Sequence, residues 1–572
     1  MTDRPTHRDE RPSVGGSDPP NRTAGRQPPP PTRPAPPPAS AVLDAAHEGD
    51  IEGAFGRIPV GDVGARATWR QRLMTLAAIV GPGIIVMVGD NDAGGVSTYA
   101  QAGQNYHTSL LWTLLLLIPV LVVNQEMVVR LGAVTGVGHA RLINERFGRG
   151  WGAFSVGDLF VLNFLTIVTE FIGIALGADY FGVSRDIAVP VAAVALVAIT
   201  ASGSFARWER AMFVFIAVSV LQAPMLFLSR PHWRTVTRDF VVPGISGGFH
   251  SAAVLLIIAI VGTTVAPWQL FFQQSNIIDK RITPRFMNYE RADTVIGAVV
   301  VVLGAAALMV TANYGASGTS AFGHFTSALG VARLLGHRGS GLGTIFAIVL
   351  MDASIIGASA VTLSTSYAFG DVFGIHHSLH RTFREARSFY LSYTTMVVLA
   401  AGIVLIPGAP LGLITTSVQA LAGLLLPSAS VFLLLLCNDR EVLGPWVNPT
   451  WLNVLAALII GVLLVLSGTL MATTLFPRVN VALISEILAG SLAVGGAAAF
   501  VVVRAVAHPA ERQVTPTATP EQKLSWRMPP LALLRPVRWS PGTRLGMLSL
   551  RAYLVLSAVL LVVKAIQLGS GH

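Results

Sequence analysis

The sequence predicts an all-α polytopic membrane protein built from two inverted repeats, and three observations carry this fold class. Hydrophobic residues make up 52% of the 572 residues and charged residues only 12%, whereas soluble proteins carry about a quarter of charged residues. Apolar spans of roughly 20 residues, the length that a bilayer requires, recur from residue 73 almost to the C-terminus. Two of these spans, the first and the sixth, are interrupted at corresponding positions.

The apolar spans predict about 13 helices and divide the chain into segments. The spans cover approximately residues 73–103, 109–132, 152–179, 187–202, 209–229, 249–275, 293–314, 342–373, 389–407, 410–437, 450–476, 481–504 and 549–568. Six segments follow: a disordered Pro-rich cytoplasmic tail (1–70), a first repeat of helices 1–5 (71–230), a second of helices 6–10 (231–438), helices 11–12 (439–507), a basic Pro-rich linker (508–545) and a last transmembrane helix (546–572).

Basic residues in the loops predict the orientation of the helices. They cluster after the second and the sixth helix: Arg130, Arg141, Arg146, Arg149, Lys280, Arg281, Arg285 and Arg291. Because cytoplasmic loops carry the positive excess, we expect a plasma-membrane protein with a cytoplasmic N-terminus. The loop from Arg230 to Arg238 is an exception. Five helices in each group mean that the second repeat crosses the membrane in the opposite direction.

Composition also excludes several functions. A pI near 10.2 would suit nucleic-acid binding, but the arginines are scattered over loops between apolar spans, so no nucleic-acid partner is expected. Cys437 is the only cysteine and has no Cys or His neighbours at zinc spacing. No nucleotide loop or metal-hydrolase motif is visible, so we expect neither an enzyme nor a cofactor, and no partner protein is evident.

The first helix is interrupted by Gly89–Gly95, a segment with two aspartates. Glycines let the backbone leave helical geometry, and unwound carbonyl groups are tolerated at membrane depth only where they face protein or a cavity. Carboxylates at that depth are costly and are normally paired, solvated or functional. Asp90 and Asp92 beside carbonyl oxygens suit a hard cation. A kink or a close helix contact is the structural alternative.

The sixth helix is interrupted by Gly262–Gln269. Pro267 removes one backbone hydrogen bond, and Thr263 and Thr264 supply oxygen atoms around the break. Proline kinks are common in membrane helices, so this break alone is the weaker signal. Because it opens the second repeat, as the other break opens the first, the pair favours a binding site between the repeats.

The residues around both breaks resemble the Nramp family of divalent-metal transporters. Gly81-Pro82 leads after nine residues to Asp92-Ala93-Gly94-Gly95, where the family has Asp-Pro-Gly-Asn, and Ala266-Pro267-Trp268 stands where it has Met-Pro-His. Further matches lie in Gln125–Met127 with Arg130, in Glu170 with Gly173, in Gln419 with Leu424–Pro427, and in Asn438–Pro449. The resemblance spans roughly residues 70–500 and implies a LeuT-like inverted repeat with additional C-terminal helices.

Two departures make the chain similar to the Nramp-related magnesium transporters. Ala266 replaces a thioether ligand, which would favour softer transition metals. Gly95 replaces an amide. The site is therefore expected to be wide and oxygen-rich, which suits Mg²⁺ because this ion dehydrates reluctantly and keeps several waters.

The resemblance also implies the site residues. Asp92 would supply the main charge, and the metal-site residues are Asp92, Gly95, Thr263, Ala266 and Gln419. Four more residues are expected next to the ion or along its path: Asp90, Asn91, Thr264 and Gln269. Two other acids in apolar spans, Asp158 and Asp352, have no assigned role.

Positions that serve proton coupling in the family are altered here, namely Ile167, Glu170, Trp268 and Gln273. Histidine is the natural proton carrier near neutral pH, and Trp268 stands in its place. Weak or absent proton coupling is therefore expected. A membrane potential of about 100 mV, negative inside, favours inward movement of a divalent cation by roughly 4.6 kcal/mol, so uptake needs no proton.

The sequence thus predicts a secondary transporter that moves partly hydrated Mg²⁺, and also Mn²⁺, by alternating access across the plasma membrane. The metal ion and the lipid bilayer are the expected partners. Two alternatives stay open: a proton-coupled Mn²⁺ or Fe²⁺ transporter of Nramp type, and a sodium-coupled amino-acid-type symporter on the same fold. Asp92 argues against the symporter, whose break should be uncharged so that its amides can face a substrate carboxylate.

Overall fold

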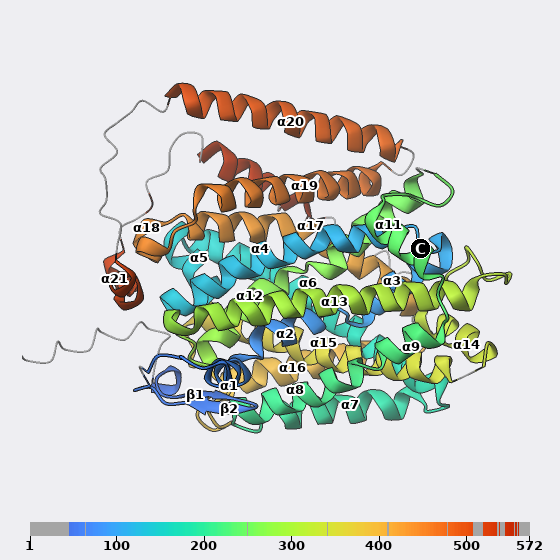
Figure 1. Cartoon of the computed structure of the whole chain (residues 1–572), viewed down its shortest axis with the longest axis horizontal. Coiled ribbons are helices and arrows are strands. Elements are labelled where there is room, and N and C mark those ends of the chain that lie inside the picture. The colour runs from blue at the N-terminus through green and yellow to red at the C-terminus, as the bar shows by residue number, and fades with distance from the viewer. Residues whose placement is uncertain are drawn as a thin grey trace, which may run out of the picture. The chain divides into compact units, whose positions relative to one another are not determined.

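The computed structural model describes residues 45–62, 64–248, 250–339, 341–408, 411–476, 479–506 and 519–534, and shorter pieces as far as residue 559. In this part of the chain one two-stranded sheet accompanies a bundle of long, roughly parallel helices (Figure 1). Eight of the described helices are long and apolar enough to cross a membrane, or nine if a bent pair counts as one span.

The helices of the first repeat follow the predicted spans. Helix 1 consists of three pieces, and the helices that follow it coincide with the other four predicted spans of this repeat. Their bounds are α1 (Trp69–Ile79), α2 (Pro82–Val88) and α3 (Ala93–Tyr106) for helix 1, then α4 (Leu111–Thr135), α5 (His139–Phe147), α6 (Arg149–Tyr180), α7 (Arg185–Thr200), α8 (Phe205–Ser219) and α9 (Gln222–Leu228).

The second repeat has the same plan, with a broken helix 6 at its start. Its elements are α10 (Trp233–Val241), then α11 (Ser251–Thr264) and α12 (Pro267–Asp279) for helix 6, η2 (Pro284–Phe286), α13 (Met287–Ala316), α14 (Ala328–His337), α15 (Leu342–Phe373), α16 (Arg387–Val404) and α17 (Leu411–Cys437).

The C-terminal elements add two long helices to this core. They are α18 (Arg440–Leu443), η3 (Gly444–Trp446), α19 (Thr450–Leu475), α20 (Val481–Val506), α21 (Pro520–Ser525) and η4 (Leu531–Leu533). Helix α20 packs against α19 and lies outermost, at the top of Figure 1. Twelve of the predicted spans thus coincide with helices, while much of the thirteenth lies outside the described residues.

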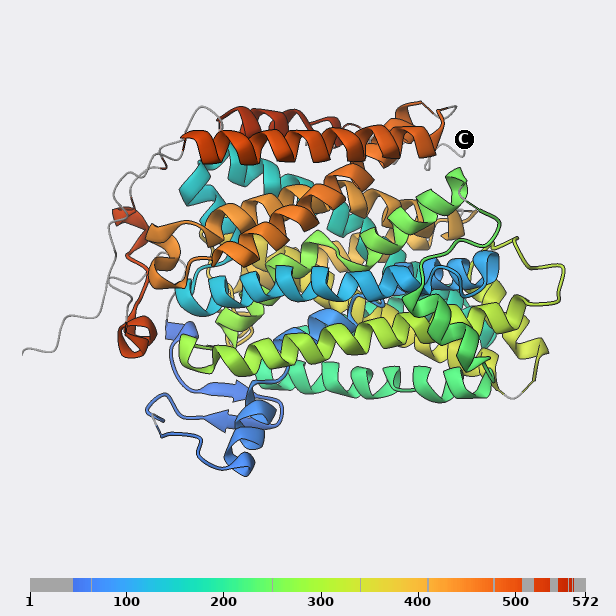
Figure 2. The same cartoon turned by 45° about the horizontal axis from the view of Figure 1, so that its top comes forward.

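A short β-hairpin precedes helix 1. After η1 (Ala45–His47), strands β1 (Ile51–Gly53) and β2 (Gly56–Ile58) pair antiparallel, with Ile51 opposite Ile58. The hairpin packs on α1 so closely that a methyl group added at Gly53 would lie 2.0 Å from the Ala78 carbonyl oxygen. It lies at the same end of the helix bundle as α21 (Figure 2). These residues fall within the segment predicted as a tail, most of which, residues 1–44, is outside the described part.

Both predicted breaks are confirmed, and each has a local cause. In helix 1 the α-helix stops at Val88 and restarts at Ala93, with Asp92 as the N-cap of α3. In helix 6 it stops at Thr264 and restarts at Pro267, because proline fits the first helical position but cannot continue a helix. Helix 1 also bends by 55° between α1 and α2, just before Pro82.

Candidate ion site between the broken helices

Asp92 lies buried at the N-terminus of α3. Its Oδ1 accepts a hydrogen bond of 2.7 Å from the Gly95 N–H, which is the usual geometry of an aspartate N-cap. The next residue, Ala93, donates its N–H to Glu170 Oε2 at 3.0 Å, so the carboxylate of helix 3 (α6) stands beside Asp92. Two buried carboxyl groups this close favour a shared proton or a bound cation.

Helix 8 (α15) approaches Asp92 and Glu170 closely at a glycine. A methyl group added at Gly357 would lie 2.7 Å from Glu170 Oε2 and 2.9 Å from Asp92 Cβ. Gly173 of α6 meets Ala93 and Ser354 with similar closeness. Small residues on helices 3 and 8 therefore let both helices approach the helix 1 break directly.

A chain of amide groups joins the two breaks. The Gln269 Nε2 group donates to Asp90 Oδ1 and, at 3.1 Å, to the carbonyl of Thr264 on the far side of the helix 6 break. Gln125 of α4 donates to Gln269 Oε1 at 3.0 Å. Asp90 is thus held by Gln269.

The threonines and Asn91 have different surroundings. Thr264 Oγ1 lies 2.7 Å from the Tyr99 hydroxyl and donates to the Ile260 carbonyl, so it is bonded within the bundle. Thr263 Oγ1 is buried and has no hydrogen-bond partner among the described residues, which makes it an available oxygen next to the break. Asn91 donates to the Val301 carbonyl of α13 at 3.1 Å and so turns toward helix 7.

The close surroundings of Gly95 and Trp268 do not match the prediction of a wide site. A methyl group added at Gly95 would lie 2.7 Å from the Asp90 carbonyl oxygen, so the glycine permits close packing within the break. Trp268 is buried, and its ring lies 3.2 Å from where a Gly89 side chain would start. These two residues therefore do not themselves widen the site.

The residues at the altered proton-coupling positions do not all lie at the candidate ion site. Glu170 is at the site, whereas Ile167 is a buried apolar residue. Gln273 lies further along α12, where it donates to Thr294 Oγ1 of α13 at 2.9 Å. The side chain of Gln419 lies outside the described residues.

Two further intramembrane acids, Asp352 and Glu126, have partners away from the breaks. Asp352 accepts a 2.6 Å hydrogen bond from Ser219 of α8. Glu126 pairs with Arg130 at 3.0 Å, as its spacing indicates, and with Arg291 at 2.6 Å. Sequence reasoning missed the role of Gln125 as a link, although that residue lay within a recognised motif.

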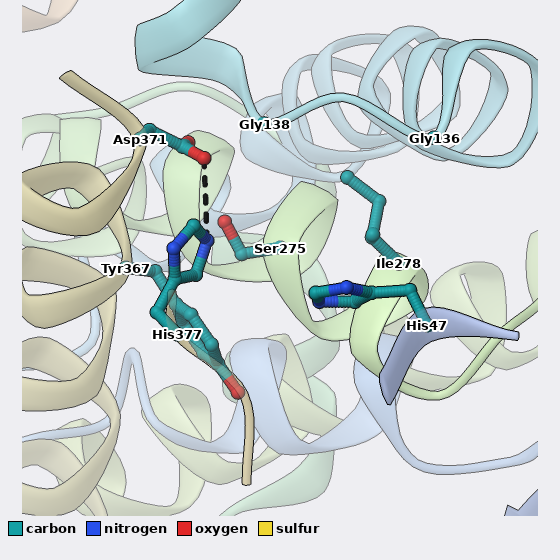
Figure 3. A pocket seen from close by; sticks show the side chains of 8 residues that line it. All are labelled: His47, Gly136, Gly138, Ser275, Ile278, Tyr367, Asp371 and His377. Atoms are coloured by element: carbon teal, nitrogen blue, oxygen red, sulfur yellow. Dashed lines mark ion pairs between the residues drawn. The ribbon is translucent and has the colours of Figure 1, made fainter. Parts of the chain in front are cut away.

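A small polar cavity, with room for about one water, lies where α12, α15 and η1 meet (Figure 3). Asp371 and His377 form its charged wall, with His377 Nε2 3.3 Å from Asp371 Oδ1, and Ser275 and His47 also line it. His377 Nδ1 donates to the Ile375 carbonyl at 2.8 Å. With that nitrogen protonated, Nε2 can donate to Asp371 only if the imidazole is the cation.

The donor set at the breaks consists of oxygen atoms. Within the described residues, no group of three or more His, Cys, Asp and Glu side chains is placed to hold a metal ion. A cation here would therefore rely on Asp92 and Glu170 together with backbone and threonine oxygens, a set that hard ions prefer.

Two matching helix breaks around buried carboxylates define a polytopic membrane protein of the LeuT-like inverted-repeat class. Residues 83–473 match the family model described as "Natural resistance-associated macrophage protein-like". The chain belongs to this family, Nramp.

Curated relatives and solved structures agree with this assignment. The chain is 25% identical over 427 residues to the "Divalent metal cation transporter MntH" of Lacticaseibacillus casei, covering 70% of this chain and 90% of that one. For the MntH of Bacillus subtilis the identity is 26% over 421 residues, covering 70% and 93%. A crystal structure of the manganese transporter of Eremococcus coleocola matches with a TM-score of 0.58 at 19% identity, covering 78% of this chain and 98% of that one.

Proposed function

We propose that this protein transports divalent metal ions by alternating access, with Mg²⁺ as the main cargo and Mn²⁺ as a second one. The observation that carries the proposal is Asp92, a buried carboxylate at the N-terminus of α3 beside Glu170. Membership of the Nramp family and relatives named divalent metal cation transporters support the class of cargo.

The preference for Mg²⁺ rests on the donor atoms. Ala266 supplies no sulfur, and the remaining groups near the breaks are carboxylate, hydroxyl and carbonyl oxygens, which do not favour transition metals. The same residue pattern supports placement in the magnesium branch of the family. An alanine at this position also leaves space for a water molecule that Mg²⁺ retains.

Each part of the site has a proposed role. Asp92 binds the ion, Thr263 and the backbone carbonyls of the helix 6 break complete its surroundings, and Glu170 neutralises charge beside it. Gln269 holds the two breaks together through Asp90. Because each repeat begins with one of the two broken helices, rocking of one repeat against the other would open the site to one side and then to the other.

We further propose that transport does not require a proton gradient. Trp268 and Ile167 cannot take up a proton, so two of the four altered positions carry no titratable group. The membrane potential would then drive uptake, with the N-terminus in the cytoplasm and the protein in the plasma membrane.

The test uses purified protein in liposomes with a Mg²⁺-sensitive dye inside. The unmodified chain is expected to take up Mg²⁺ in response to a negative internal potential, without an imposed pH gradient and without acidification of the liposome interior. Asp92→Ala should abolish uptake, whereas Asp158→Asn, which removes a carboxylate of the same repeat, should not. Unchanged uptake by Asp92→Ala would refute the site.

A proton-coupled Mn²⁺ or Fe²⁺ transporter is the second candidate, and the closeness of Glu170 to Asp92 favours it. The same liposomes distinguish the two functions. Strong selectivity for Mn²⁺ over Mg²⁺ together with internal acidification would support the second candidate. A sodium-coupled amino-acid symporter is disfavoured because a carboxylate would face the carboxylate of its substrate.

A further inference from the structure

Four charged side chains lie fully buried around the bend between α1 and α2. They are Glu209 of α8, Lys280 after α12, and Glu290 and Asp293 of α13. Three are carboxyl groups and only one is a cation, so full ionisation would leave a net negative charge in the inner part of the helix bundle. Because uncompensated buried charge is very costly, at least one of these groups must be neutralised.

Lys280 forms an ion pair with Glu209. Its Nζ lies 2.6 Å from Glu209 Oε1, and both side chains are completely buried. The same ammonium group donates to the carbonyls of Ile79 at 2.7 Å and Val80 at 3.0 Å, at the C-terminal end of α1. Its three donors are thus used, and its charge balances Glu209.

Asp293 has the partners of an ionised carboxylate. Its Oδ2 accepts hydrogen bonds from the N–H groups of Gly81 at 3.0 Å and Gly83 at 2.7 Å, on the far side of the bend. Two backbone donors to one carboxylate stabilise the anion. Lys280 and Asp293 therefore fix the two sides of the bend, one through carbonyl groups and the other through amides.

Glu290 is the carboxyl group of this set that has neither an ion-pair partner nor a short hydrogen bond within the described residues. Its Oε1 has only a 3.4 Å contact with Gln273 Nε2, and its Oε2 has no hydrogen-bond partner in the described part of the chain. It stands three residues before Asp293, which places both carboxyl groups on one face of α13. The adjacent Arg291 is bonded to Glu126 of α4 at 2.6 Å.

Charged groups on the elements packed around Glu290 include Asp293 on its own helix, Glu209 on α8, Lys280 after α12, and the Glu126–Arg291 pair. Arg130 of α4 and Arg285 of η2 donate to Glu126 and to the Gly64 carbonyl. Lys280 and Arg291 already serve Glu209 and Glu126, so none of these groups supplies Glu290 with a cation of its own.

We propose that Glu290 is a proton-binding site, separate from the metal site, that controls the bend in helix 1. With its proton in place, Glu290 is neutral and packs against Gln273 and Thr294 while Asp293 alone carries charge. Loss of the proton places two carboxylates one turn apart under the bend and favours its release. The proton then regulates movement of the inner part of helix 1, and it need not cross the membrane with the metal.

The first test is Mg²⁺ uptake into liposomes with equal pH on both sides, so that no proton gradient exists. Between about pH 5 and pH 9, the range around the usual carboxyl and histidine values, the uptake rate of the unmodified chain should change with pH. Glu290→Gln, which imitates the protonated group, should give an active protein that has lost this dependence. Asp352→Asn, which removes a buried carboxyl group on another helix, is the matched control and should keep it. A Glu290→Gln profile that matches the unmodified chain would overturn the proposal.

The second test is thermal unfolding in detergent, which needs no transport and is therefore independent of the proposed function. If folding keeps Glu290 protonated while the unfolded chain releases that proton, the folding constant of the unmodified chain falls by up to about tenfold per pH unit relative to Glu290→Gln. Parallel pH dependences of the two proteins would contradict the proton site. Sodium chloride that stabilises only the unmodified chain at constant pH would show a metal cation as the occupant instead.

Discussion

The side-chain amide of Gln269 donates a hydrogen bond to the carboxylate of Asp90, and this bond joins the two broken helices where both lose helical geometry. The same amide group bonds the Thr264 carbonyl at 3.1 Å, across the break of its own helix. Gln125 of helix 2 (α4) donates a hydrogen bond of 3.0 Å to Gln269 Oε1. One glutamine thus stabilises both breaks and ties them to each other.

Replacement of Gln269 by leucine should destabilise the protein by about 1–3 kcal/mol, the cost of leaving a buried polar group unsatisfied. Asp90 would lose its partner on Oδ1, and its Oδ2 already has none among the described residues. Thermal unfolding in detergent measures the effect. Gln222→Leu is the control, because the side-chain oxygen of this buried glutamine lacks a partner in the same part of the chain. Equal losses in both variants would contradict the link.

Gly357→Ala should weaken metal transport and lower stability. The added methyl group would lie 2.7 Å from Glu170 Oε2, so Glu170 and Asp92 must shift, at a cost of about 1–3 kcal/mol for an overpacked site. Uptake in liposomes and the unfolding temperature both report it. Gly402→Ala in the last turn of α16 meets nothing within 4 Å and should instead gain up to about 1 kcal/mol. Unchanged uptake and an unchanged unfolding temperature in Gly357→Ala would show that helix 8 is not tightly packed against Glu170 and Asp92.

Ala266→Met should shift selectivity from Mg²⁺ toward Mn²⁺ and softer ions. The thioether adds a ligand that transition metals prefer and occupies space that a hydrated Mg²⁺ needs. Competition between Mn²⁺ and Mg²⁺ for uptake measures the change, and Ala266→Leu separates the bulk of the side chain from its sulfur. The same selectivity in the methionine and leucine variants would leave the sulfur without a role.

His377 should make stability depend on pH. Burial alone would lower the pKa of His377, but the hydrogen bond and charge of Asp371 outweigh it, so the pKa is raised. The stabilisation is therefore complete below the unfolded value of about 6.5 and disappears as pH rises through the folded pKa. The unfolding temperature of the unmodified chain should fall over that range, and that of His377→Gln should fall less steeply.

His139 provides the control for this prediction. Burial lowers the pKa of His139 to about 4, so this imidazole is neutral throughout the same range. His139→Gln should therefore keep the pH dependence of the unmodified chain above pH 6.5, even though it loses its contact with Gln274. A flat profile in this variant would mean that His377 is not the titrating group.

The fold and the breaks were predictable because their signals are local. Twelve apolar spans coincide with helices, since hydrophobicity over a bilayer thickness reveals them one at a time. The breaks at Asp92 and Pro267 follow from glycine and proline chemistry within each helix. The second break in helix 1, before Pro82, was visible only as a loosened Gly-Pro-Gly stretch, because its 55° bend depends on Lys280 and Asp293 from other helices.

By itself, the sequence determined the all-helical membrane fold, the inverted repeat, and the positions of both breaks with their acidic residues. Only the tertiary structure decided which side chains meet: Glu170 beside Asp92, Gln269 on Asp90, and Glu290 next to Asp293, with no hydrogen-bond partner for Glu290 Oε2 in the described part of the chain. The reason is physical. Hydrophobicity and backbone propensity act over neighbouring residues, whereas the cost of a buried charge depends on groups that are brought together from distant parts of the chain.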